Sequence, residues 1–439
     1  MGSFLPSTAA ERREMLAFLG LRSADELYAA VPPEVFLSQP PDLPPPKAEL
    51  EVRRTMEGLA ARNKVFRTIL RGAGAYDHYI PAAVGRIASK ESFVTAYTPY
   101  QAEISQGVLQ AIFEYQTMIC ELTGMDVSNA SVYDGAAAAA EAVAMTRERG
   151  RSAAVVSAAI HPDVLATIRT YCFGSDTDLI VAPVPGGITD LSALKGLLTG
   201  KTACVYVQQP NFFGLIEPCD AIAEAVHEAG AKLILGVVPS TLGVLKSPRE
   251  WGADIAVGEG QPLGLPLGWG GPYLGFMAAT SALMRRLPGR IVGQTTDKNG
   301  ERAFVLTLQA REQHIRREKA SSNICSNQAL CALTASVYLS MMGPEGLRQV
   351  GGQCYAKAHW FADELCKLKG VKRRHSGEFF LEFVTDLPVP PERVLSALEQ
   401  KNILGGLPVY VFILWGVTEK HTRRQLEEAL AVIGEVCLP

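Results

Sequence analysis

A series of short apolar runs separated by helical stretches constrains the fold more than any other feature of this sequence. Helical periodicity lies between most of the earlier runs, as at 192–198 and 220–229. The runs predict seven strands, at Ala153–Ala158, Leu179–Val184, Ala203–Val207, Lys232–Val238, Asp254–Val257, Tyr273–Ala279 and Ala303–Leu308. Alternation of strands with helices is typical of an α/β fold, so we predict a mainly parallel, doubly wound seven-stranded sheet.

The N-terminal part of the chain differs from this pattern. Thr8 and Ser23 each precede a helical pattern, which predicts two short helices. A proline-rich stretch at 40–46 follows and is flanked by apolar residues. We therefore expect residues 1–65 to form a helical arm that lies on a surface.

The rest of the chain predicts two domains. Residues 66–345 are expected to form the large domain, whose first long helix runs from about residue 100 to a stop at Gly124. After residue 370 strand and helix patterns alternate again, with strands at 378–384 and 409–414. Residues 346–439 are therefore expected to form a small C-terminal α+β domain.

Composition and charge exclude several classes of protein. The 439 residues carry a net charge of -3, which gives no general field that would attract nucleic acid or anionic lipid. The sequence shows neither a signal peptide nor an apolar run of membrane-spanning length. The nine cysteines include no Cys-x-x-Cys pair, so we expect no metal site and a reduced, cytoplasmic location.

The residue at the exit of the fifth predicted strand is the most informative for function. The strand that begins at Asp254 runs into a glycine-rich loop that ends at Gly271, and Gln261 stands at the exit. In many α/β enzymes that bind pyridoxal phosphate, a lysine before such a loop holds the cofactor as a Schiff base. The nearest lysines here are Lys246 and Lys298, far off in sequence.

The acid that the pyridine nitrogen of this cofactor requires is also missing. It usually stands at the end of the next-to-last strand before the lysine. Here the strand at 232–238 continues Pro-Ser-Thr-Leu-Gly-Val-Leu, and no Asp or Glu occurs between Lys232 and Glu250. Two parts of a pyridoxal site are therefore absent together.

Two other positions are candidates for the remnant of such a site. Gly135 begins a run of alanines that would place backbone amides at a helix N-terminus, where a phosphate can bind, although the same alanines could simply pack closely. His161 follows a predicted strand and could stack over a cofactor ring. A lone histidine at such a position is more often structural.

Two segments suit a binding surface. The turn from Tyr97 to Tyr100 places two phenols around a proline, which favours either a binding surface or internal aromatic packing. The run from Arg311 to Asn323, with His314 inside it, is dense in charge of both signs. A solvated helix face, an anion clamp and a subunit contact would each explain that run.

Several segments spread along the chain carry the residue patterns of one known family. They are Gly74–His78 with Pro81, Tyr97–Gly107, Tyr115–Met118, Leu122–Gly124, Asn129–Ser131, Tyr133–Gly135, Gln261–Pro272, Pro288–Gly293 and Arg311–Asn327. Together they resemble the P-protein of the glycine cleavage system, glycine dehydrogenase (aminomethyl-transferring). The resemblance is specifically to the first subunit of the form that is split into two chains, and it covers nearly the whole sequence.

This resemblance implies a fold like that of aspartate aminotransferases, fold type I of the pyridoxal-phosphate-dependent transferases. It implies a second P-protein subunit that carries pyridoxal phosphate on a lysine, with this chain lining that subunit's active site. The implied reaction is the decarboxylation of glycine, with transfer of the aminomethyl group to the lipoyl arm of the H-protein. The residues expected to contribute to the partner's site are Tyr97, Thr98, Tyr100, Arg311, His314 and Asn323, and those of a vestigial cofactor pocket are Gly135, His161 and Gln261.

Two alternatives remain open. The chain could be a purely structural or regulatory partner that contributes no group to the chemistry, which alanine substitutions of Tyr97 and Tyr100 would test. It could also be an independent pyridoxal-dependent enzyme, such as a lyase or a desulfurase, with an unconventional lysine. Borohydride trapping with peptide mapping would reveal that lysine.

Overall fold

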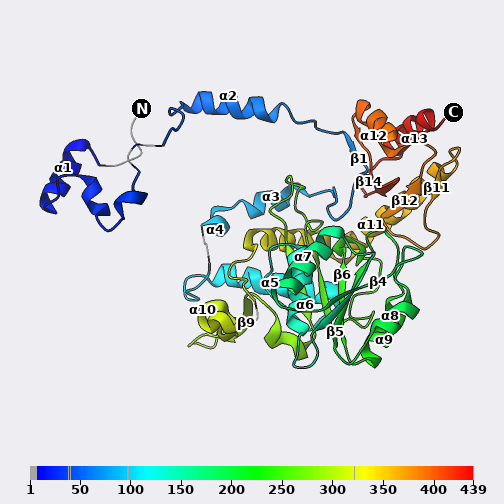
Figure 1. The fold of residues 1–439 in the computed structure, drawn as a ribbon, viewed down its shortest axis with the longest axis horizontal. Helices are drawn as coiled ribbons and strands as arrows, with labels where there is room; N and C mark the ends of the chain where they lie inside the picture. Colours follow the sequence, from blue (N-terminus) through cyan, green and yellow to red (C-terminus); the bar gives the residue numbers. More distant parts are fainter. Residues whose placement is uncertain (1–6, 38, 40, 96–97, 321, 439) are drawn as a thin grey trace. The chain divides into compact units, whose positions relative to one another are not determined.

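The computed structural model describes residues 7–37, 39, 41–95, 98–320 and 322–438, so Tyr97 lies outside the described residues. The chain divides into two compact units, Met1–Lys64 and Val65–Pro439 (Figure 1). The first unit contains α1 (Ala9–Phe18), η1 (Ala24–Tyr28), η2 (Pro33–Val35) and α2 (Glu49–Ala60). None of these helices has a buried residue.

Local hydrogen bonds explain where the helices of the first unit begin. The Thr8 hydroxyl accepts from the Glu11 amide at 3.2 Å, and the Glu11 carboxylate accepts from the Thr8 amide at 2.6 Å, which forms a capping box. Glu51 accepts from the Ala48 amide at the start of α2 in the same way. The helices therefore form from local signals, while their apolar side chains stay exposed.

A seven-stranded sheet organises the second unit. Its strand order is β2-β8-β7-β6-β5-β3-β4. The bounds are β2 (Val127–Ser128), β3 (Ala153–Ser157), β4 (Leu179–Ala182), β5 (Thr202–Gln209), β6 (Lys232–Val237), β7 (Ile255–Glu259) and β8 (Gly275–Ala279). Strands β7, β6, β5, β3 and β4 are parallel, whereas β8 and β2 join antiparallel at one edge. The predicted mainly parallel seven-stranded sheet is confirmed.

One strand of the prediction is wrong. The run Ala303–Leu308 forms β10 (Arg302–Thr307), which pairs with β9 (Ile291–Thr296) in a separate antiparallel hairpin. This hairpin buries Phe304 and Val292 against α5 (Gln106–Thr123), so its apolar residues need no place in the main sheet. The seventh strand of that sheet is β2, which at two residues is too short to show a period of two.

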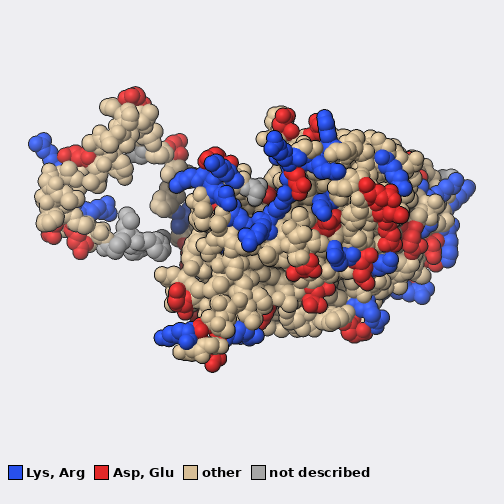
Figure 2. All heavy atoms as spheres, turned by 90° about the horizontal axis from the view of Figure 1, so that it is seen from below, with Lys and Arg blue, Asp and Glu red and all other residues tan. Residues whose placement is uncertain are grey.

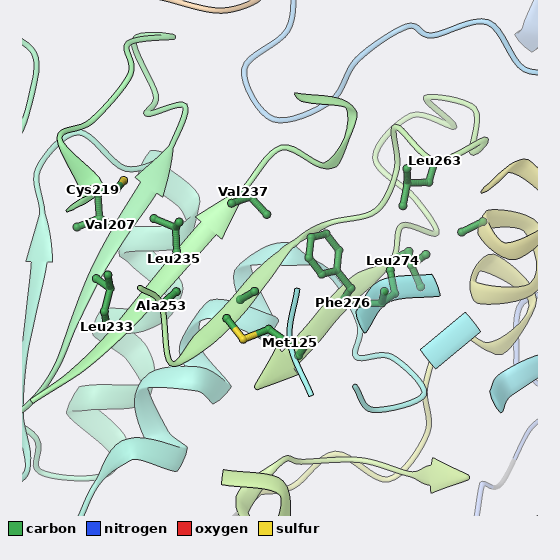
Figure 3. Packing of buried hydrophobic residues seen from close by; sticks show 14 of the residues in the cluster. Met125, Val207, Cys219, Leu233, Leu235, Val237, Ala253, Leu263, Leu274 and Phe276 are labelled. Atoms are coloured by element: carbon green, nitrogen blue, oxygen red, sulfur yellow. The ribbon is translucent and has the colours of Figure 1, made fainter. Parts of the chain in front are cut away.

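Side chains alternate between two hydrophobic layers on the faces of the sheet. Val205 and Leu233 belong to one layer, and Tyr206 and Ile234 belong to the other. The first layer includes residues of α5, α8 (Leu191–Leu197), α9 (Cys219–Glu228) and α11 (Ala329–Cys366). The second includes residues of α6 (Gly135–Thr146) and α7 (Pro162–Gly174). Figure 3 shows part of the first layer, where Val207, Leu233, Leu235 and Phe276 gather over the sheet.

A smaller sheet has its own core. Its order is β11-β12-β15-β14, from β11 (Lys372–Arg373), β12 (Glu382–Asp386), β14 (Leu407–Val409) and β15 (Phe412–Gly416). Helices α12 (Pro391–Gln400) and α13 (Arg423–Cys437) lie with it at one end of the second unit (Figure 1). Trp415 and Phe361 are fully buried there. Helix α11 reaches this core after an interruption at Gly343, whose φ is 59°.

The remaining elements connect these layers. They are β1 (Thr68–Ile69), α3 (Ala82–Ala88), α4 (Glu91–Val94), η3 (Pro239–Thr241), η4 (Ser281–Arg286), η5 (Gln309–Arg311), α10 (Gln313–Arg316), η6 (Arg317–Lys319) and β13 (Ile403–Leu404). Among the described residues, every helix is too short or too polar to cross a membrane. Figure 2 shows acidic and basic side chains interspersed on one face, with broad areas that carry neither.

Candidate functional site

A cavity of about 290 Å³ lies where the central parallel strands end. Residues at the ends of β5, β6 and β7 line it, together with the first turn of α6 and the loop at 73–76. In open α/β sheets, ligands collect at this carboxyl edge. The lining includes Asp134, Asp163 and Glu259 but no lysine and no arginine.

Carboxylates occupy the helix N-terminus at which a phosphate would bind. The Gly135 amide donates to Glu259 Oε2 at 3.0 Å, and the Ala137 amide donates to Asp134 Oδ1 at 2.7 Å. Glu259 Oε1 also accepts from the amides of Gln261 and Leu274, at 2.9 and 2.8 Å. Burial raises the pKa of Glu259, and these three amide bonds oppose that rise. The α6 amides of Gly135 and Ala137 are therefore already used by acids of this chain.

Gln261 is not among the residues that line the cavity, and its side chain joins two loops. Its Oε1 accepts from the Tyr76 amide at 2.8 Å, and its Nε2 donates to the carbonyls of Tyr76 and Leu265 at 3.0 and 2.8 Å. The side chain is 1% exposed, so this amide is fully engaged. At the cavity, the phenol of Tyr206 packs against Gly236 so closely that a Cβ there would lie 2.1 Å from the Tyr206 Oη.

These residues do not fit pyridoxal phosphate. No lining residue offers an amine, and β6 ends in Gly236 and Val237 without a carboxylate for a pyridine nitrogen. A phosphate dianion at α6 would face Glu259 and Asp134 with no lysine or arginine among the described lining residues to balance them. The pocket therefore has the position of a cofactor site without its donors.

His161 lines the cavity as a helix cap. Its Nδ1 accepts from the Asp163 amide at 3.1 Å at the start of α7, and its Nε2 lies 2.9 Å from the Ala73 carbonyl oxygen. Because Nδ1 accepts, the proton resides on Nε2. The ring meets Phe212 edge-on at 5.4 Å. Nε2 thus helps to fix the loop at 73–76, while Nδ1 caps α7.

Tyr100 lies on the surface beside a buried arginine. Tyr100 is 67% exposed, and its amide donates to the Thr98 carbonyl at 2.9 Å. The Arg290 Cζ lies 5.6 Å from the centroid of the Tyr100 ring. The structure therefore places Tyr100, the described tyrosine of the predicted turn, next to a cation.

The charged run from Arg311 to Asn323 contains a half-buried, hydrogen-bonded arginine and exposed residues. Arg311 is half-buried, and its Nε and Nη2 donate to the carbonyls of Leu308 and Gly289 at 3.1 and 2.7 Å. His314 is exposed on the short helix α10, with Nδ1 3.5 Å from Glu312. Asn323 is exposed in the segment before α11. Arg311 is thus the member of this run that comes near Arg290, through the carbonyl of Gly289.

Sequence reasoning did not single out three of the residues that shape this region. They are Tyr206 in a predicted strand, Glu259 in the segment before Gln261, and Arg290 in the segment Pro288–Gly293. An acid between two glycines at the end of a buried strand was a signal for Glu259. No pattern in the sequence indicated that Arg290 would be buried, since an isolated arginine is exposed in most proteins.

One group of side chains among the described residues has the composition of a metal site. His78, Cys354 and Glu419 place one ligand atom each within 4.8 Å of one another. His78 Nδ1 lies 2.6 Å from Glu419 Oε2, and the Cys354 thiol donates to the same oxygen at 3.5 Å. These bonds join the loop before α3, helix α11 and the segment after β15, so they act as a structural link.

The fold identifies the structural class to which the protein belongs. It is the fold of the type I pyridoxal-phosphate-dependent transferases, as the prediction stated. Solved structures that share it include a sphingosine-1-phosphate lyase of Burkholderia pseudomallei, with TM-score 0.67, 16% identity and coverage of 93% of this chain and 94% of that one. An alanine-glyoxylate aminotransferase of Nostoc sp. shares it with TM-score 0.59, 15% identity and coverage of 92% and 98%. At such identities the likeness shows the fold alone.

The chain belongs to the glycine cleavage system P-protein family, whose model matches residues 2–433. Relatives called "Probable glycine dehydrogenase (decarboxylating) subunit 1" are 49% identical in Carboxydothermus hydrogenoformans and 50% identical in Moorella thermoacetica, each over 98% of this chain and 99% of the relative. A crystal structure of glycine decarboxylase (P-protein) in inhibitor-bound form has TM-score 0.93 and 44% identity, covering 99% of this chain and all of that one. The predicted family is confirmed.

Proposed function

We propose that this chain is subunit 1 of a two-chain glycine dehydrogenase (decarboxylating) of the glycine cleavage system. The names of relatives that match over their full length support this assignment. In that complex, glycine is decarboxylated and the aminomethyl group passes to the lipoyl arm of the H-protein. A second P-protein subunit is the direct partner.

We further propose that the partner carries the pyridoxal phosphate. The observation that supports this most strongly is the occupied helix N-terminus, where Glu259 and Asp134 take the amides of Gly135 and Ala137. The cofactor would supply the electron sink for decarboxylation. This chain would position substrate and exclude water from the partner's site, which requires no lysine.

The residues proposed to reach the partner's site are Tyr97, Thr98 and Tyr100, with Arg311, His314 and Asn323 as further contributors. The exposure of Tyr100 and the contact of its ring with Arg290 support the first group. A phenol can donate a hydrogen bond while its ring packs, so an exposed tyrosine next to a cation suits an interface with polar substrate. Gly135, His161 and Gln261 would then serve as the remains of a cofactor pocket.

Reconstitution tests the proposed function. The purified chain should bind no pyridoxal phosphate and should catalyse no exchange between glycine and bicarbonate until the second subunit is added. Tyr100→Phe should lower the exchange rate of the complex about tenfold or more, because removal of a catalytic-site donor typically costs that much. Tyr410→Phe, at another exposed tyrosine, is the matched control and should leave the rate unchanged. Full exchange by this chain alone would overturn the proposal.

A purely structural subunit is the second candidate. It is favoured by the internal hydrogen bonds of His161, Gln261 and Arg311, each of which is engaged within this chain. If Tyr97→Ala and Tyr100→Ala complexes assemble and turn over at the wild-type rate, this candidate is correct. An independent pyridoxal-dependent enzyme is disfavoured because no lysine lines the cavity.

We propose a cytoplasmic location. All nine cysteines are free thiols, from Cys120 to Cys437. Free, largely buried thiols are typical of proteins kept in a reducing compartment. Fractionation of cells that express a tagged full-length chain would test this, and recovery in a membrane or secreted fraction would contradict it.

A further inference from the structure

Arg290 is a buried cation without an acidic partner. It is 6% exposed, and among the residues that the structure describes it is the sole lysine or arginine in the buried class. Burying a charge is costly unless the charge is paired and hydrogen-bonded. Within the described part of the chain, the guanidinium has a ring contact with Tyr100 and no ion pair, and its nitrogens are absent from the enclosed side-chain atoms that lack a partner, so they can be reached from outside.

The other buried charged groups show that this is unusual for the molecule. Glu382 accepts from the Ala73 amide and the Tyr76 hydroxyl. Glu217 accepts from Asn211 Nδ2 at 2.8 Å and from the Thr189 amide at 2.9 Å. These buried carboxylates are therefore satisfied internally, whereas the guanidinium of Arg290 stays available to a partner from outside the described residues.

The backbone around Arg290 is held in place from three directions. The Arg290 carbonyl accepts from the Ala130 amide at 2.8 Å, and Asn129 Nδ2 donates to the Pro288 carbonyl at 2.9 Å. Arg311 Nη2 donates to the Gly289 carbonyl at 2.7 Å. The guanidinium therefore projects from a fixed base, which lowers the entropy cost of binding a ligand.

A second cation accompanies it. Arg311 uses Nε and Nη2 for carbonyls, and its Nη1 has no partner among the described residues. Burial lowers the pKa of Arg311, and the Glu312 carboxylate opposes this shift. Glu312 is thus an acid whose charge acts on Arg311, and an anion bound there would compete with this carboxylate.

We propose that Arg290, with Tyr100 against it and Arg311 beside it, binds a small oxyanion, either a carboxylate or a phosphate. The planar fork of a guanidinium matches both anions bidentately, and the bond is charge-assisted. The identity of the natural anion rests on the proposed function. In the two-chain enzyme it would be the carboxylate of glycine or the phosphate of the partner's cofactor.

Titration of the isolated full-length chain tests the site itself. Calorimetry with inorganic phosphate and with acetate should detect binding of at least one anion by the wild type. Arg290→Gln should weaken it by roughly tenfold to a hundredfold, as expected for one charge-assisted pair. Arg285→Gln, at an exposed arginine in η4, should leave the affinity unchanged. Binding of neither anion by the wild type, or equal affinity in Arg290→Gln, would overturn the proposal.

Thermal unfolding separates a ligand site from a structural role. Because the described side-chain contact of Arg290 is with the Tyr100 ring, Arg290→Gln should unfold within a few degrees of the wild type in anion-free buffer. Added phosphate should raise the melting temperature of the wild type more than that of the variant. Should Arg290→Gln fail to fold, Arg290→Lys and Tyr100→Leu carry the test, and wild-type anion affinity in both would overturn the proposal.

The two-chain complex identifies the anion. If Arg290→Gln raises the KM for glycine about tenfold while cofactor content stays the same, the natural anion is the substrate carboxylate. If cofactor content falls at unchanged assembly, the anion is the cofactor phosphate. Unchanged KM and cofactor content would overturn the assignment to the partner's site. A wild-type complex without glycine exchange would instead refute the proposed function, while anion binding by the isolated chain would still stand.

Discussion

At the scale of single residues, buried carboxylates hold the loops around the pocket. Glu382 of β12 accepts from the Ala73 amide at 2.5 Å and from the Tyr76 hydroxyl at 2.7 Å, which ties the small sheet to the loop at 73–76. Glu259 accepts three backbone amides at the other side of the same pocket. Acids of the chain thus take the donors that a bound ligand would otherwise use.

Glu382 predicts a pH dependence of stability. Burial raises its pKa from 4.5 to about 7, against the opposing bonds from Ala73 and Tyr76. Between about pH 4.5 and 7 the native state therefore binds more protons than the unfolded chain, so the free energy of unfolding falls as pH rises through this window, by up to about 3 kcal/mol. Denaturant unfolding of Glu382→Gln should show a flatter pH profile there.

The matched control for this prediction is Glu392→Gln, at an exposed glutamate of the same domain. It should keep the wild-type pH profile, because an exposed carboxylate has a similar environment in both states. A Glu382→Gln profile as steep as that of Glu392→Gln would show that Glu382 is not the group responsible.

The candidate site could be predicted from sequence in part. The absence of a lysine at Gln261 and of an acid after β6 is visible in the chain, because each is a local feature of one strand end. The contact between Gln261 and Tyr76 joins residues 185 positions apart, so no local pattern encodes it. The same holds for Arg290, whose contact with Tyr100 joins residues far apart in the sequence.

At the scale of elements, Glu259 joins the start of α6, the end of β7 and the residue that precedes β8. Replacement by alanine leaves the amides of Gly135, Gln261 and Leu274 without their acceptor. Each orphaned buried donor costs on the order of 1–3 kcal/mol, so we predict that Glu259→Ala lowers the free energy of unfolding by about 3 kcal/mol or more.

Denaturant titration measures this loss. Glu259→Gln, which keeps one acceptor oxygen, should fall between the alanine variant and the wild type. Glu224→Ala, at an exposed position on α9, should stay within about 0.5 kcal/mol of the wild type. A Glu259→Ala protein as stable as Glu224→Ala would refute the role assigned to this side chain.

Gln261→Lys tests whether the pocket lacks more than an amine. The lysine would stand at the strand exit, but the α6 amides would remain bound to Glu259 and Asp134. We therefore predict that the variant still binds no pyridoxal phosphate, as measured by absorbance after dialysis against the cofactor. Stoichiometric cofactor uptake by Gln261→Lys would show that the missing lysine alone explains the loss.

Most elements of the large sheet could be predicted because buried parallel strands are continuous apolar runs. Those at 153–158 and 232–238 correspond closely to β3 and β6. The assignment of strands failed where the alternation of apolar and polar residues gives no information about the sheet. Strand β2 has two residues, and β10 belongs to a hairpin whose partner strand β9 is mostly polar toward its end.

At the scale of the whole molecule, the chain contains a folded body and an arm without a core. We propose that the body divides near residue 345, where α11 is interrupted at Gly343. The arm exposes large apolar side chains such as Phe18 at 90% and Leu43 at 73%. We propose that this exposed apolar surface is an interaction site.

Removal of residues 1–64 should therefore affect assembly more than folding. Because the body has its own hydrophobic clusters, we predict that residues 65–439 retain the far-ultraviolet circular dichroism expected of the body and a melting temperature within a few degrees of the full chain. Affinity for the second P-protein subunit, measured by sedimentation, should fall at least tenfold. Wild-type affinity of the truncated chain would contradict this role of the arm.

The central claim is that this chain serves a pyridoxal enzyme without holding the cofactor. Borohydride reduction of the reconstituted two-chain complex, followed by peptide mapping, tests it most directly. We predict that the pyridoxyl label appears entirely on a lysine of the partner subunit. A label on any lysine of this chain, such as Lys246 or Lys298, would contradict the account.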